Sequence, residues 1–274
     1  MEAIAEIFGQ PASIYTDTEK RITSASVFLP KFDRDHRAVL RAALARIRAA
    51  GLNTGPARIS ARRIARANWA ESWKRHFKPL EISSGLLVLP SWSKRRAKRG
   101  QAVVILDPGL SFGTGHHPTT AFCLEQIAAS RDTNTTQSLL DIGTGSGILA
   151  IAAWKLGYSP VAALDFDPDA VRVAGENAAA NRAGITISRR DLTRLPARVS
   201  RKFDVVCANL TYDLLIQERR RIPNRLSDRG ILVLAGILRG QFPAVRRAYE
   251  QAGMYLVAHR AVGEWHSGAF RFRR

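Results

Sequence analysis

The sequence predicts an α/β fold, with a doubly wound, mostly parallel sheet preceded by a small α+β unit. From residue 118 onward, short apolar strands alternate with helical segments, as in a sheet covered on both faces. A glycine-rich turn, Gly143 to Gly147, joins one strand to the next helix. Asp165 and Asn209 stand at the ends of two later strands, where ligands of such folds bind.

The first 80 residues predict the small unit and a helix after it. Alternating apolar residues indicate strands near Ala12–Thr16 and Ile22–Leu29, and a helix runs from about Asp33 to Ala50. A second helix is predicted from Asn68 until Pro79 stops it, with an aromatic stripe along one side.

Two apolar runs, Leu86–Leu89 and Val103–Leu106, predict paired strands. The basic run Lys94–Arg99 lies between them. We interpret it either as a solvated hairpin tip or as a contact for a polyanion.

The alternating region predicts the elements of the large sheet. Strands are expected at Ser138–Ile142, Val161–Phe166, Ile185–Ser188, Phe203–Ala208, Ile231–Ala235, Tyr255–Val262 and Ala269–Phe272. Helices are expected from Pro118, at Ile148–Leu156, from Pro168, at Tyr212–Leu226 and at Gln241–Ala252. The final order of one helix and two strands indicates that the last strands form an antiparallel pair.

Composition and charge restrict the class of protein. No apolar stretch is long enough to cross a bilayer and no secretory signal is visible, so we expect a cytoplasmic protein without membrane contact. Cys123 and Cys207 have no metal or redox spacing. The formal charge is +19, and residues 1–100 hold 20 Lys and Arg against 8 Asp and Glu. This basic part either attracts polyanions such as ribosomal RNA or reflects high arginine usage.

The glycine turn and Asp165 predict a nucleoside site. A dinucleotide fingerprint has a glycine at its sixth position, where this chain has Ile148, so the turn favours a ligand without a pyrophosphate. Asp165 ends the next strand, where a carboxylate can accept hydrogen bonds from both ribose hydroxyls. The structural alternative is helix capping before Pro168, a role that suits Asp167.

Several motifs together carry a family resemblance. The glycine turn, Asp165 and the strand Phe203–Asn209 have the order found in class I S-adenosylmethionine methyltransferases. The segment Asp107–Thr120, read as DPGLSFGTGHHPTT, closely resembles the signature of the ribosomal protein L11 methyltransferase (PrmA) family. The match continues through Asn68–Trp92, Leu139–Asp169, Ala235–Leu238 and Glu264-Trp265.

The resemblance implies a seven-stranded Rossmann-like fold, S-adenosylmethionine as cofactor, and methylation of amino groups of a large-subunit ribosomal protein. It implies three parts: a shortened basic recognition domain at 1–65, a connection at 66–117 and the methyltransferase domain at 118–274. We expect a monomer, with contact to ribosomal RNA through the basic N-terminal part.

The resemblance also assigns site residues. Cofactor contacts fall on Phe112, Gly113, Thr120, Gly143, Gly145, Asp165 and Asn209, with Asp191 as a further candidate for the adenine. Asn209 and Tyr212 are the predicted catalytic residues, because Asn209-Leu210-Thr211-Tyr212 stands where many amino-methyltransferases have Asn-Pro-Pro-Tyr. Tyr212 either lines the acceptor site through a cation–π contact or packs at the start of its helix.

Other classes of function fit the sequence less well. Gly109–Gly113 fits the nucleophile elbow of a hydrolase, with Asp165 and either His259 or His266 as partners, but glycines and a proline postpone the helix that an elbow needs. His116-His117 suggests a metal, yet no further ligand has suitable spacing, so no metal is expected. A non-catalytic RNA-associated protein and a methyltransferase for other lysines or for ribosomal RNA remain alternatives.

Overall fold

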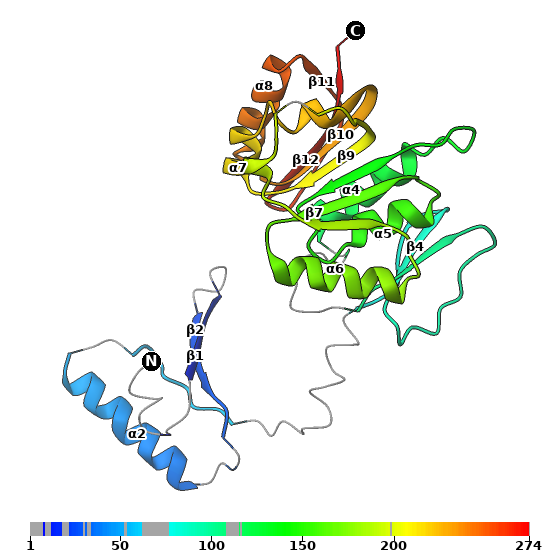
Figure 1. Cartoon of the computed structure of the whole chain (residues 1–274). Coiled ribbons are helices and arrows are strands. Elements are labelled where there is room, and N and C mark those ends of the chain that lie inside the picture. The colour runs from blue at the N-terminus through cyan, green and yellow to red at the C-terminus, as the bar shows by residue number, and fades with distance from the viewer. Residues whose placement is uncertain are drawn as a thin grey trace. The chain divides into compact units, whose positions relative to one another are not determined.

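The computed structural model describes residues 8, 12–17, 22–29, 31, 34–51, 54–61, 77–107, 115, 117–197 and 199–273. The chain forms two compact units, Met1–Ser72 and Trp73–Arg274, here called the N-terminal unit and the C-terminal unit (Figure 1). The three-part division at residues 65 and 117 remains a prediction.

The N-terminal unit contains the two strands and the helix that the sequence predicts. β1 (Ala12–Asp17) and β2 (Ile22–Val27) pair antiparallel, and α2 (Arg34–Ala49) follows. Helix α2 has an acidic residue in its first turn and basic residues in its last turn, which complements the helix dipole. The predicted helix from Asn68 to Pro79 lies largely outside the described residues.

The C-terminal unit begins with a three-stranded sheet in the order β3-β4-β5. β3 (Leu80–Ser83) pairs antiparallel with β4 (Leu86–Leu89), whereas β4 and β5 (Ala102–Ile105) run parallel. The predicted strands β4 and β5 are confirmed, but the hairpin between them is wrong. The sequence analysis missed β3, which is the strand that pairs antiparallel with β4. Residues 90–101 form a crossover connection, and β5 pairs in parallel with the other edge of β4.

The large sheet has seven strands in the order β11-β12-β10-β9-β6-β7-β8 (Figure 1). Its strands are β6 (Leu139–Ile142), β7 (Val161–Asp165), β8 (Thr186–Arg189), β9 (Phe203–Asn209), β10 (Leu226–Leu238), β11 (Met254–Val262) and β12 (Trp265–Phe272). The helices are α4 (Pro118–Ala129), α5 (Ile148–Lys155), α6 (Pro168–Ala180), α7 (Tyr212–Gln217) and α8 (Phe242–Gln251). β12 pairs antiparallel with both β10 and β11, while β6 to β10 pair in parallel, so the predicted doubly wound fold is confirmed.

One predicted helix is too long. Helix α7 ends at Gln217 rather than at Leu226, and a short 3-10 turn, Pro223–Arg225, precedes β10. A proline lacks the amide hydrogen that a helix interior needs, so a helix could not run through Pro223 to Leu226, and α7 already ends before that proline.

The large sheet separates two hydrophobic clusters. In β9, Val205 and Cys207 belong to the cluster formed with α4 and α5, whereas Val206 and Ala208 belong to the cluster formed with α7 and α8. This alternation follows the two-residue period of a strand. The core thus fixes each strand between two helical layers and holds the carboxyl ends of β6 to β10 in place. Among the described residues, no helix is long and apolar enough to cross a membrane.

Candidate functional site

Three of the predicted site residues, Gly143, Asp165 and Asn209, lie in one row at the carboxyl edge of the large sheet. In the strand register, Arg189 lies opposite Asp165 and Asn209 opposite Ala235. Gly143 directly follows the end of β6, which lies between β7 and β9. Because neighbouring strands are about 4.8 Å apart, Asp165 and Asn209 stand roughly 10 Å apart on either side of the glycine turn.

The glycine turn has a backbone conformation that residues other than glycine rarely adopt. Gly143, Gly145 and Gly147 have φ values of 74°, 53° and 81°. A Cβ atom on Gly147 would lie 3.1 Å from the Cβ atom of Ala174, because α6 packs directly against this turn. The glycines therefore let the backbone turn sharply and bring α5 and α6 together at the ligand edge.

Asp165 is buried at the end of β7 and is bonded to the glycine turn. Its carboxylate accepts hydrogen bonds from the amide of Gly145 at 3.0 Å and from the amide of Asp167 at 3.1 Å. A carboxylate has about four acceptor positions, so further hydrogen bonds to a ligand are available. The Asp167 side chain accepts from the amide of Asp169 and caps α6, so the predicted cap is confirmed, and the ribose contact of Asp165 remains a prediction.

Two predicted contact residues have buried oxygens that lack a partner. Among the described residues, Thr120 Oγ1 and Asn209 Oδ1 are buried and accept or donate no hydrogen bond within the protein. Buried polar groups are nearly always hydrogen-bonded, so a ligand or an ordered water molecule can supply the missing partner of each oxygen.

Gly236 in β10 supports the segment that carries Asn209. It has a φ of 80°, and a Cβ atom there would lie 2.4 Å from the backbone oxygen of Leu210 and 3.0 Å from Asn209 Oδ1. The sequence analysis did not recognise this role. The signal was a glycine inside an otherwise apolar strand, which often marks a close backbone approach.

A polar connection from α6 also supports the glycine turn. The Asn177 side chain donates to the backbone oxygen of Ser146 at 2.8 Å. One turn later, the buried Asn181 side chain accepts from the amide of Ile105 at 2.7 Å and donates to its oxygen at 2.7 Å. The turn is thereby linked through α6 to β5.

Asp141 lies fully buried beneath the same turn. Burial raises the pKa of its carboxyl to about 7, and the nearby Asp165 acts in the same direction, although a hydrogen bond from Thr144 at 2.6 Å opposes the rise. At neutral pH this carboxyl is therefore about half protonated.

We expect Asp141→Asn to change how stability depends on pH. The unfolded carboxyl titrates near 3.8, so raising the pH from there to about 7 ionises the unfolded state first and lowers wild-type stability. The amide side chain of the variant would not titrate, so the stability of wild type relative to the variant should fall by roughly 2–3 kcal/mol between about pH 5 and pH 8. Urea unfolding of both proteins across this range measures the difference, and parallel pH profiles would contradict it.

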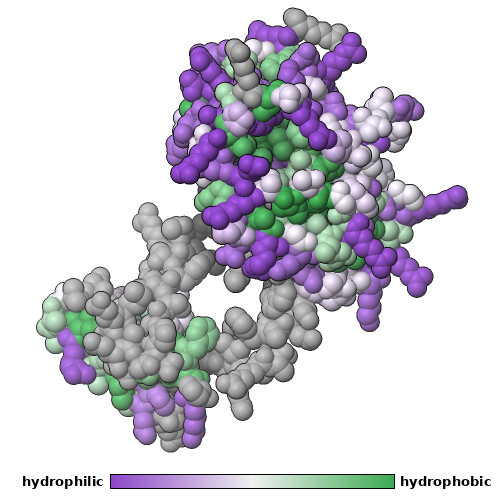
Figure 2. All heavy atoms as spheres, in the orientation of Figure 1, coloured by the Kyte–Doolittle hydropathy of each residue, from purple (hydrophilic) through white to green (hydrophobic). Residues whose placement is uncertain are grey.

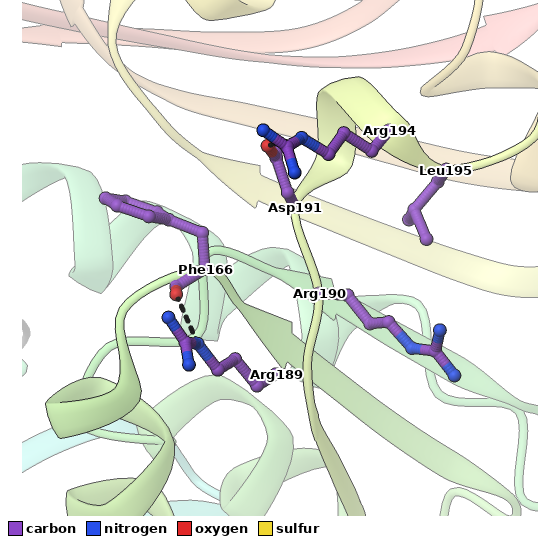
Figure 3. A pocket seen from close by; sticks show the side chains of 6 residues that line it. All are labelled: Phe166, Arg189, Arg190, Asp191, Arg194 and Leu195. Carbon is purple, nitrogen blue, oxygen red and sulfur yellow. Dashed lines mark hydrogen bonds and ion pairs between the residues drawn. The ribbon is translucent and has the colours of Figure 1, made fainter.

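A pocket lies at the carboxyl ends of β7 and β8 and is lined by Phe166, which directly follows Asp165 in the sequence (Figure 3). Its lining residues are Phe166, Arg189, Arg190, Asp191, Arg194 and Leu195. Phe166 is 71% exposed, and Arg189 donates to its backbone oxygen at 3.2 Å. An exposed ring directly after the candidate ribose carboxylate suits a flat aromatic ligand. The sequence analysis gave Phe166 no such role, although an aromatic residue after a strand-end acid was visible.

The remaining predicted residues are not part of the row formed by Gly143, Asp165 and Asn209. Asp191 caps a 3-10 turn by accepting from the amide and hydroxyl of Thr193, which lowers the pKa of its carboxyl together with the nearby Arg194. Tyr212 begins α7 and packs against the cluster of α7 and α8. Phe112 and Gly113 lie outside the described residues.

The hydrolase and metal alternatives find no support in the described residues. His259 and His266 lie on β11 and β12, and β12 stands four strand positions from the Asp165 strand. That separation is roughly 19 Å, too far for a hydrogen-bonded triad. No group of three metal-ligating side chains occurs in the described part of the chain.

Comparisons with known proteins show which family the chain belongs to. A family model described as ribosomal protein L11 methyltransferase (PrmA) matches residues 6–273. A relative of that name from Streptococcus uberis is 36% identical over 278 residues, covering 97% of this chain and 85% of the relative. Another from Streptococcus thermophilus is 37% identical over 226 residues, covering 81% and 69%. The crystal structure of a ribosomal protein L11 methylase from Lactobacillus delbrueckii subsp. bulgaricus has a TM-score of 0.63 at 30% identity, covering 72% of this chain and 100% of that chain.

Fold and site together define a class I methyltransferase that depends on S-adenosylmethionine. The chain belongs to the ribosomal protein L11 methyltransferase (PrmA) family. The predicted fold class, family, cofactor and enzyme class are thereby confirmed.

The residues present fit this cofactor. Asp165 offers an acceptor carboxylate for hydroxyl groups, and the glycine turn offers a close backbone approach. The unpartnered oxygens of Thr120 and Asn209 add polar atoms to the same C-terminal unit.

Proposed function

We propose that the protein methylates amino groups, of lysine or of the N-terminus, on large-subunit ribosomal protein L11. Asp165 accepts hydrogen bonds from the ribose, the turn at Gly143 and Gly145 contacts the methionine part, and Thr120 and Asn209 bind its polar groups. Phe166 packs against the adenine. The observation that carries the proposal is the row of Asp165, Gly143 and Asn209 at one sheet edge, in a chain of this family.

The chemistry asks little of the protein beyond positioning. When bound, S-adenosylmethionine supplies a methyl group that is already activated by the sulfonium. The protein has to align the acceptor nitrogen with this group and exclude water. The buried Asn209 Oδ1 is an acceptor that can orient an amine N–H. Tyr212 follows on the same segment and would border the acceptor site.

The acceptor amine must be neutral before it attacks. A lysine with a pKa of about 10.4 has to lose a proton, whereas an α-amine with a pKa of about 8 needs less assistance. Desolvation beside a cationic group favours the neutral amine, so no dedicated base is required.

We further propose that the protein acts as a cytoplasmic monomer and that its basic surface contacts ribosomal RNA. The excess of Lys and Arg in residues 1–100 supports such contact.

The substrate is tested by incubating the full-length protein with ribosomal subunits and S-adenosylmethionine. We expect mass spectrometry to find increments of about 14 Da, the mass of one methylene, on ribosomal protein L11 and on no other chain. The Asp165→Ala variant is the matched control and should add none. Increments on ribosomal RNA, or on other ribosomal proteins with none on L11, would contradict the proposal.

A further inference from the structure

The crossover between β4 and β5 concentrates positive charge on the C-terminal unit. Residues 90–101 form this segment, here called the basic loop, and Figure 1 draws it as a blue-green loop that extends away from the sheets. Its five basic side chains are all exposed: Lys94, Arg95, Arg96, Lys98 and Arg99. Figure 2 shows hydrophilic residues over much of the described surface of this unit, with a smaller apolar area between them.

One carboxylate holds part of the basic loop in place. Glu81 of β3 forms ion pairs with Arg95 and with Lys98, the latter at 2.6 Å. These two hydrogen-bonded cations lower the pKa of the Glu81 carboxyl. Gln101 donates from its side chain to the backbone oxygen of Ser83 at 3.3 Å, which ties the end of the loop to the same strand. The loop is therefore a fixed feature of the sheet.

The other three cations have no partner of opposite charge. Within the described part of the chain, Lys94, Arg96 and Arg99 make no ion pair and no side-chain hydrogen bond. Glu81 pairs with Arg95 and Lys98, and the Asp107 carboxylate accepts hydrogen bonds from the amide and the hydroxyl of Ser91. An ordinary charged surface mixes both signs, whereas the two acids bonded to this loop, Glu81 and Asp107, pair with neither Lys94, Arg96 nor Arg99. The loop thus presents three unpaired cations in a short, anchored segment, as a binding site for a polyanion requires.

The side chains of the loop favour nucleic acid over an acidic protein. Protein interfaces depend on buried aromatic or aliphatic anchors at their centre. Between Ser93 and Gly100 the one apolar residue is Ala97, and Trp92 at the base of the loop is half-buried. Arginine and lysine without apolar neighbours suit phosphate groups, which arginine can bind in a bidentate manner.

We propose that the basic loop binds the phosphate backbone of ribosomal RNA through Lys94, Arg96 and Arg99. This inference rests on the proposed ribosomal function and assigns an RNA contact to the C-terminal unit, in addition to any contact by the N-terminal unit. Binding there would hold the enzyme next to its ribosomal substrate without reading base sequence.

The test compares two triple variants of the full-length protein. The loop variant is Lys94→Gln/Arg96→Gln/Arg99→Gln. The control variant, Arg220→Gln/Arg229→Gln/Arg247→Gln, removes the same charge from exposed arginines that make no ion pair in the described structure. Binding to deproteinised large-subunit ribosomal RNA is measured over a salt series. The loop variant should bind about tenfold or more weakly, with a salt slope smaller by roughly 2–3, because each lost phosphate contact reduces the slope by about 1. The control should change less than half as much.

Equal losses in both variants would overturn the proposal, because net charge alone would then explain the binding. A loop variant that binds RNA like wild type would also overturn it. Loss of polyglutamate binding in that variant would then favour an acidic protein partner. Equal melting temperatures of the three proteins show that folding is unaffected.

Methylation of free ribosomal protein L11 is measured in parallel. Unchanged methylation by the loop variant, with weakened RNA binding, supports the inference. Wild type that fails to methylate L11 under any condition refutes the proposed function separately, since RNA binding is read directly.

Discussion

Asp165→Ala is expected to lower the affinity for S-adenosylmethionine by at least about a hundredfold. Hydrogen bonds to a charged acceptor contribute roughly 1.5–3 kcal/mol each, and a carboxylate that holds two ribose hydroxyls supplies two of them. The substitution also removes the 3.0 Å hydrogen bond from the amide of Gly145, so the glycine turn loses a tether. Isothermal titration calorimetry measures the change.

The neighbouring carboxylate provides a matched control. Asp167→Ala removes the cap of α6, which should cost about 1 kcal/mol of stability. Its affinity for the cofactor should stay within about threefold of wild type, because that carboxylate has no role at the ribose. Equal affinities of Asp165→Ala and wild type would show that the ribose binds elsewhere.

Gly236→Ala is expected to lower both stability and the rate of methyl transfer. The added Cβ atom would meet the backbone oxygen of Leu210 at 2.4 Å, and the φ of 80° is unfavourable for alanine. Strain and displacement of this kind cost on the order of 2–4 kcal/mol. Because the displaced segment carries Asn209, kcat should fall at least about tenfold, as expected for a misplaced acceptor site. Urea unfolding and single-turnover kinetics measure the two effects.

Gly240→Ala is the control for this substitution. No atom lies within 4 Å of a Cβ atom at Gly240. Stability should therefore change by less than about 0.5 kcal/mol, with unchanged kinetics. Equal stability and equal kcat of the two glycine variants would show that the close approach of β10 to Leu210 does not affect stability or catalysis.

Local patterns in the sequence predicted most of the fold. The regular alternation after residue 118 indicated the order of strands and helices, because apolar periodicity records which face of each element is buried. The parallel pairing of β4 and β5 was not visible, since the direction of a strand depends on distant partners such as β3. The early end of α7 was missed although Pro223 was in view.

The sequence predicted those parts of the candidate site in which the residue type itself indicates a role, namely the glycine turn and Asp165. The glycine turn and Asp165 are adjacent in the structure because the turn follows β6 and Asp165 ends the neighbouring parallel strand β7. The contact between Gly236 and Leu210 and the unpartnered oxygen of Asn209 arise from packing between elements, so sequence spacing did not reveal them. The same applies to the hydrogen bonds of Asn177 and Asn181, which join segments far apart in the chain.

A crystal structure of the protein with S-adenosylhomocysteine, the demethylated product, tests the central claim most directly. The account predicts that the ribose hydroxyls lie within hydrogen-bonding distance of the Asp165 carboxylate, beside the glycine turn, and that Asn209 Oδ1 gains a partner. Density for the product at another place, or none at this sheet edge at saturating concentration, would contradict it.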